Sequence, residues 1–71
     1  MARLLTTTVT TTEGTTVTEG DVCETLECRE QMNAAQREFQ SKGWKIDKRV
    51  GMFYATRGDD TATVVMTRKT N

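Results

Sequence analysis

The chain has 71 residues, no histidine, and ten basic and ten acidic side chains that leave no net charge. This length is near the lower limit at which one domain can hold a hydrophobic core by itself. Because general acid–base catalysis at neutral pH most often uses histidine, the composition argues against an enzyme. We therefore expect a single non-catalytic domain, residues 1–71, with no cofactor and no metal.

The first residues, MARLLTTTV, lack the apolar core of a signal peptide, and no apolar run is long enough to cross a membrane. Charge is divided along the chain: seven of the ten acidic residues precede residue 42, and seven of the ten basic residues follow residue 41. These features predict a cytoplasmic protein without membrane contact, acidic on one side and basic on another.

Cys23 and Cys28 are the two cysteines of the chain. Two thiols without an imidazole do not supply the four ligands that zinc requires. A disulfide requires the backbone to turn between them, because residues five apart on one helix point in different directions. We therefore expect reduced thiols, as is usual in the cytoplasm.

The stretch TTTVTTTEGTT, residues 6–16, contains eight threonines and one large apolar residue. Threonine is β-branched and favours strands, so residues 1–20 are predicted to form a hairpin that turns at Glu13 and Gly14. Leu5 and Val9 share one face of its first strand, and mostly threonines share the other. Since isolated hairpins are marginal in water, we expect its unpaired edge to add to another sheet.

A helix is predicted over residues 22–42. Asp21 and Glu24 fit a capping box, with Thr25 as an alternative N-cap. The apolar residues recur at spacings of four, three and four, which places them along one stripe: Cys28, Met32, Ala35 and Phe39. Gly43 is suited to the left-handed position that ends a helix, after which the tryptophan packs back.

Residues 44–69 are predicted to form three strands, WKIDKR, MFYATR and TATVVMTRK, joined by the turns VG and GDD. The element order is then β-β-α-β-β-β. This order predicts an α+β fold, with one antiparallel sheet and one helix packed across one of its faces. The predicted core comprises Cys28, Met32, Ala35, Phe39, Trp44, Ile46, Val64, Met66 and one of Phe53 or Tyr54.

Two binding functions fit the chain. The first is protein binding, to a second copy or to a host protein, through the threonine hairpin and an acidic helix: Thr6, Thr8, Thr10, Glu24, Glu27, Glu30 and Glu38. The alternative is nucleic-acid binding, since cations bind phosphates and aromatic rings stack on unpaired bases. That alternative uses the residues interleaved in KIDKRVGMFYATR: Lys45, Lys48, Arg49, Phe53, Tyr54 and Arg57.

The segment AAQREFQSKGWKIDKR, followed by a hairpin, resembles small uncharacterised bacterial proteins in which a helix ends in Gly-Trp and a strand follows. The β-α-β-β layout, over about residues 25–69, is also similar to small phage-encoded proteins that inhibit host machinery, inhibitors of bacterial RNA polymerase among them. This resemblance implies a small non-catalytic protein of a phage or mobile element that acts by occupying a surface. It assigns no functional residue.

Overall fold

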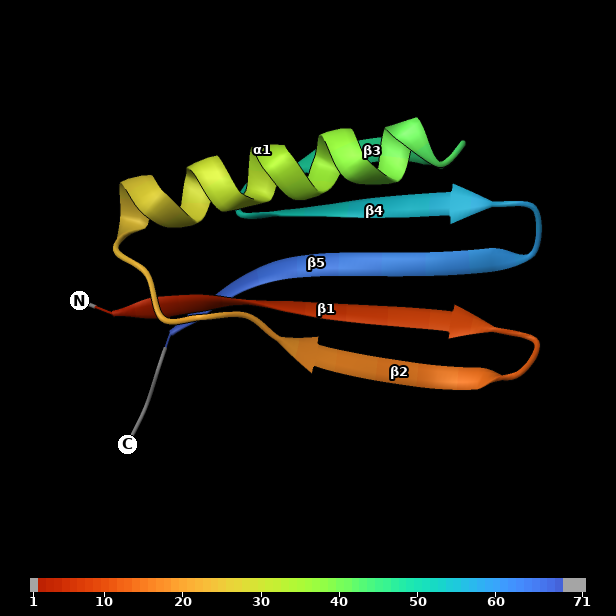
Figure 1. The fold of residues 1–71 in the computed structure, drawn as a ribbon, viewed down its shortest axis with the longest axis horizontal. Helices are drawn as coiled ribbons and strands as arrows, with labels where there is room; N and C mark the ends of the chain where they lie inside the picture. Colours follow the sequence, from red (N-terminus) through yellow and green to blue (C-terminus); the bar gives the residue numbers. More distant parts are fainter. Residues whose placement is uncertain (1, 69–71) are drawn as a thin grey trace.

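The structure, a computed structural model, describes residues 2–68. The elements in chain order are β1 (Arg3–Thr11), β2 (Gly14–Glu19), α1 (Thr25–Ser41), β3 (Lys45–Arg49), β4 (Met52–Arg57) and β5 (Asp60–Arg68). The strands form one antiparallel sheet, and α1 packs across one of its faces (Figure 1). The predicted α+β fold and its β-β-α-β-β-β order are confirmed. Lys69, the predicted end of the last strand, lies outside the described residues.

The order of strands across the sheet is β2-β1-β5-β4-β3. The first strand, β1, therefore lies between β2 and the last strand, β5, and Arg3 is opposite Arg68. The threonine hairpin is thus an integral part of the sheet. Only the outer sides of β2 and β3 remain as edges within residues 2–68.

Helix α1 begins at Thr25, with Glu24 as its N-cap and no side-chain capping hydrogen bond. The predicted start at residue 22 and the capping box from Asp21 are therefore wrong. The backbone just before the helix is held in another way: Arg3 N–H donates to the Cys23 carbonyl at 2.9 Å, and Cys23 N–H donates to the Arg3 carbonyl at 2.7 Å. This bridge to β1 keeps residue 23 in an extended conformation, so the helix begins only after it.

The late start of the helix changes the state of the cysteines. Cys23 lies outside the helix and Cys28 lies in its first turn, so the chain turns between them. Their Cα atoms are 5.4 Å apart and the two residues form a disulfide. The expectation of reduced thiols is wrong for this structure, because it assumed that both cysteines belong to one continuous helix.

The end of α1 matches its prediction closely. Gly43 has a φ of +92°, and its N–H donates to the Gln40 carbonyl at 3.1 Å. Trp44 N–H donates to the Phe39 carbonyl, also at 3.1 Å. These two bonds form a Schellman motif, which ends the helix and directs Trp44 back onto the core.

The core lies between α1 and the sheet. Phe39 packs edge-on against both Trp44 and Phe53, with ring centroids 5.2 and 5.9 Å away. Of the two alternatives Phe53 and Tyr54, Phe53 is the buried one. The buried residues of this core are Leu5, Cys23, Cys28, Met32, Trp44, Phe53, Ala55, Ala62 and Val64, and Val9, Ala35, Phe39, Ile46 and Met66 are half-buried against them. Leu4, which alternates with Leu5 along β1, is buried outside this cluster.

Two small core residues, Ala55 and Ala62, were not predicted. They are opposite each other on β4 and β5, and both are almost fully buried. A short side chain on the sheet leaves room for the larger side chains above it, which alternation of apolar residues along a strand does not reveal.

The described part of the chain contains no helix with the length and apolarity needed to cross a membrane.

Candidate interaction surfaces

The face of the sheet opposite α1 is rich in threonine. The strand registers place one residue each from β2, β1, β5 and β4 side by side in a single row: Thr15, Thr10, Thr61 and Thr56. The hydroxyls of Thr10 and Thr15 are 3.2 Å apart, within hydrogen-bond distance. Such cross-strand pairs stabilise a sheet, which accounts for threonines where few apolar contacts exist.

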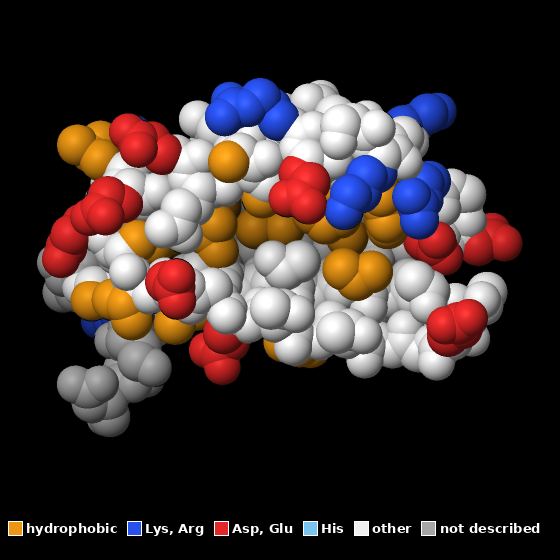
Figure 2. Space-filling model, in the orientation of Figure 1, with side chains coloured by type: hydrophobic (Ala, Val, Ile, Leu, Met, Phe, Trp, Pro, Cys, Tyr) orange, Lys and Arg blue, Asp and Glu red, His pale blue; other side chains and the backbone are white. Residues whose placement is uncertain are grey.

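The predicted protein-binding threonines, Thr6, Thr8 and Thr10, all lie on this open face. They belong to β1, an interior strand with a neighbour on each side, so their backbone groups are not free to bond to another chain. Figure 2 views the sheet from the helix side, where the side chains over the β1–β2 hairpin are likewise mostly uncharged. The sheet therefore offers hydroxyls on its open face, while an unpaired strand edge is provided by β2.

The two edges of the sheet differ in charge. All six residues of β2 are exposed, and Glu19 is its one charged residue. In β3, by contrast, four of five residues are charged. Charged side chains on an edge strand oppose pairing with another sheet, whereas β2 also lacks proline and pairs with β1 without a bulge. The outer edge of β2 is therefore the one open to strand addition.

The predicted acidic residues belong to α1 or, for Glu24, to its N-cap, on the other side of the sheet from the predicted threonines. Glu27 and Glu38 are separated by three helical turns and share a side of α1. Glu38 pairs with Lys42 at 3.2 Å, and it lines a groove of about 280 Å³ beside Thr7 and Thr18. The fold therefore does not bring together the two halves of the predicted protein-binding set. One half is the threonines, and the other is the acidic residues Glu24, Glu27, Glu30 and Glu38.

The predicted nucleic-acid set is also divided between faces. The Phe53 side chain is 0% exposed, so no base can stack on it. Arg57 belongs to the helix side, where its guanidinium lies 4.7 Å from the centre of the Trp44 ring and donates to the Lys42 carbonyl at 3.2 Å. Lys48 is on that side as well. The residues of the set on the open face are Lys45, Arg49 and Tyr54.

Arg49 is already engaged on the open face. Its guanidinium donates to Asp47 at 3.0 Å and lies 5.6 Å from the centre of the Tyr54 ring. The hydrogen bond to Asp47, followed by the charge of that carboxylate, raises the pKa of Arg49. The exposed aromatic ring is therefore partly covered by a neutralised cation, and the six residues do not form one basic aromatic surface.

Sequence reasoning missed two groups of residues that the fold places together. Thr15, Val17 and Glu19 lie along the outer edge of β2. Arg3 and Arg29, far apart in sequence, line one cavity. Neither group could be found without the strand order, since both depend on which segments become neighbours.

Among residues 2–68, no group of three or more histidine, cysteine, aspartate or glutamate side chains is placed to hold a metal ion. Comparison with protein-family models, with curated proteins and with solved structures gives no match for this chain.

Proposed function

We propose that this chain is a non-enzymatic protein-binding module that associates with a second copy of itself through the outer edge of β2. The observation that carries the proposal is the contrast between the edges: β2 is exposed and nearly uncharged, and β3 is charged along most of its length. Unprotected edges add strands from other chains through main-chain hydrogen bonds.

The phase of hydrogen bonding indicates which backbone groups of β2 are free. Gly20 N–H donates to the Leu5 carbonyl at 2.8 Å, so residues 5 and 20 form a hydrogen-bonded pair. In an antiparallel ladder these pairs alternate with non-bonded ones. Residues 14, 16 and 18 therefore bond to β1, and Thr15, Val17 and Glu19 direct their N–H and C=O groups outward.

These outward groups are suited to pairing with the same edge of a second copy. A two-fold axis through Val17 places it opposite Val17 of the partner subunit, and places Thr15 opposite the partner's Glu19. All three pairs are then of the hydrogen-bonded kind, which gives about six main-chain hydrogen bonds. The Glu19 carboxylate accepts from a threonine hydroxyl in this register, and the two open faces join into one.

Association would also support a small core. A domain of this size retains only about 3–5 kcal/mol of stability from its own interior. A three-pair edge is a small interface, so we expect a monomer–dimer equilibrium that depends on concentration. In a phage or mobile-element setting the same edge would serve to dock on a host protein, and the cytoplasmic location expected from the sequence belongs to that proposal.

Light scattering over a range of protein concentrations tests the proposal. We expect the wild type to form a dimer as concentration rises. Val17→Lys places two ammonium groups together at the two-fold axis and should remain monomeric. Val50→Lys is the matched control, because Val50 is fully exposed in the β3–β4 turn, away from β2. It should dimerise like the wild type.

A second variant separates pairing from charge. Val17→Pro removes an outward N–H that β1 does not use, so the fold should survive and the dimer should not. Circular dichroism and the melting temperature check the fold of each variant. A wild type that remains monomeric at every concentration, or a folded Val17→Lys protein that still dimerises, would refute the proposed edge pairing.

A further inference from the structure

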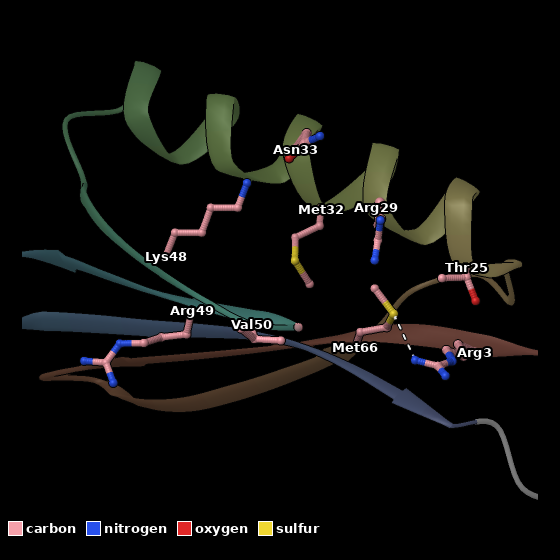
Figure 3. Close-up of a pocket in the computed structure, with 10 residues that line it drawn as sticks. Arg3, Thr25, Arg29, Met32, Asn33, Lys48, Arg49, Val50 and Met66 are labelled. Carbon is pink, nitrogen blue, oxygen red and sulfur yellow. Dashed lines mark hydrogen bonds between the residues drawn. The ribbon is translucent and has the colours of Figure 1, made fainter.

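A cavity of about 440 Å³ lies between the first half of α1, the β3–β4 turn and the end where β1 pairs with β5. Figure 3 shows side chains entering it from both layers: Arg29 and Met32 point from the helix toward the sheet, and Lys48 points from β3 toward the helix. Arg3 reaches it from β1. Its volume is within the range of sites that hold small organic ligands.

The charged residues that line the cavity are all cationic: Arg3, Arg29, Lys48 and Arg49. Arg49 is paired with Asp47 and points away from the cavity (Figure 3). Arg29 and Lys48 form no ion pair within residues 2–68. Arg3 donates to the Met66 sulfur at 3.6 Å, which is a weak acceptor. Three cations thus face one cavity, and no carboxylate of residues 2–68 forms an ion pair with them.

The inner surface of the cavity is apolar. Met32, only 6% exposed, and Met66, half-buried on β5, bring their side chains toward each other from opposite layers (Figure 3). Val50 adds an aliphatic group at the turn. Methionine side chains are flexible and polarizable, so they accommodate apolar ligands of varied shape. A ligand that fits has a negatively charged head and a short apolar tail.

From this arrangement we infer that the cavity is a binding site for an amphipathic organic anion, a carboxylate or phosphate head on a short aliphatic chain. The head accepts hydrogen bonds from Arg3, Arg29 and Lys48, and charge-assisted bonds of this kind are roughly twice as strong as neutral ones. The tail lies against Met32 and Met66. This inference is independent of the edge pairing proposed for β2, because none of these residues belongs to β2.

Methyl NMR of the methionines provides the direct test, with octanoate as the probe. The methyl signals of Met32 and Met66 should shift on titration. That of Met52, which lies on the open face of the sheet, should not. Octanol retains the tail without the charge, and acetate retains the charge without the tail, so both should bind at least roughly ten-fold more weakly. Octyl phosphate, compared with octanoate, establishes which head group is preferred.

Arg29→Gln should weaken octanoate binding by roughly ten-fold, because it removes one charge-assisted hydrogen bond. Arg37→Gln, on the same helix and outside the cavity, is the matched control and should bind like the wild type. Both arginines are exposed, so neither change should prevent folding. Absence of Met32 and Met66 shifts, equal binding of octanol, or full octanoate affinity in Arg29→Gln would each overturn the inference.

Discussion

Cys23 and Cys28 form a disulfide that joins the segment paired with Arg3 on β1 to the first turn of α1, with their Cα atoms 5.4 Å apart. Both cysteines are almost fully buried. The bond therefore belongs to the core as well as to the chain connection. It fixes the start of the helix, for which no side-chain cap is present.

Reduction of this disulfide should lower the stability of the fold. Closing a loop of so few residues restricts the unfolded chain, and this effect contributes about 2 kcal/mol in the chain-entropy description. Urea unfolding of the wild type with and without a reductant measures the difference. A Cys23→Ala variant should show no response to the reductant. Equal unfolding midpoints for the oxidised and reduced wild type would contradict the prediction.

Burial should also protect the bond in cells. Exchange requires a thiolate to reach a sulfur atom, and Cys28 is 0% exposed. Alkylation during denaturing lysis of native cells, which makes both sulfur atoms accessible, should therefore add no alkyl group to the chain in a mass measurement. Two added groups would show that both thiols are free in cells despite their burial, and would contradict the prediction.

Truncation of the Phe39 side chain should strongly destabilise the fold. Its ring lies edge-on to Trp44 and Phe53, and such a deletion costs about 3 kcal/mol or more. Since a core of this size leaves only about 3–5 kcal/mol in reserve, we expect Phe39→Ala to be largely unfolded by circular dichroism. Phe39→Leu, which keeps most of the volume, should fold with reduced stability. A cooperative melt of Phe39→Ala near the wild-type temperature would argue against this packing.

Arg57→Ala should expose Trp44 and lower the free energy of unfolding by about 1 kcal/mol. The substitution removes the guanidinium that covers the ring and donates to the Lys42 carbonyl. Tryptophan fluorescence should shift to longer wavelength. Arg68→Ala, at the end of β5, is the control and should leave the emission unchanged. A red shift of equal size in both variants would show that the effect is not specific to the Trp44 contact.

Gln36→Met should stabilise the protein. The Oε1 atom of Gln36 is buried and has no hydrogen-bond partner in the structure described for residues 2–68. Loss of its hydration without a compensating bond costs roughly 1 kcal/mol or more, and methionine has a similar shape without that group. Thermal unfolding measures the gain. Gln40→Met, at an exposed position on the same helix, should change little; a larger gain there would contradict the explanation.

Local patterns in the sequence predict the secondary-structure elements and most residues of the core. Period-two alternation located the strands, and the four-three-four apolar spacing located the helix. Gly43 marked the end of α1, where a left-handed residue is needed and the hydrogen bonds are local. These features depend on residues close together in the chain, so local chemistry is sufficient to predict them.

Long-range packing determines which strand forms the edge of the sheet and which distant residues become neighbours. Placement of β1 between β2 and β5 made the threonines of β1 interior and left β2 exposed, and the bridge from Arg3 to Cys23 moved the helix start and closed the disulfide. Strand order similarly brought Arg3 and Arg29 to one cavity. Pairing between distant segments depends on the packing of the whole sheet, which no short stretch of sequence encodes.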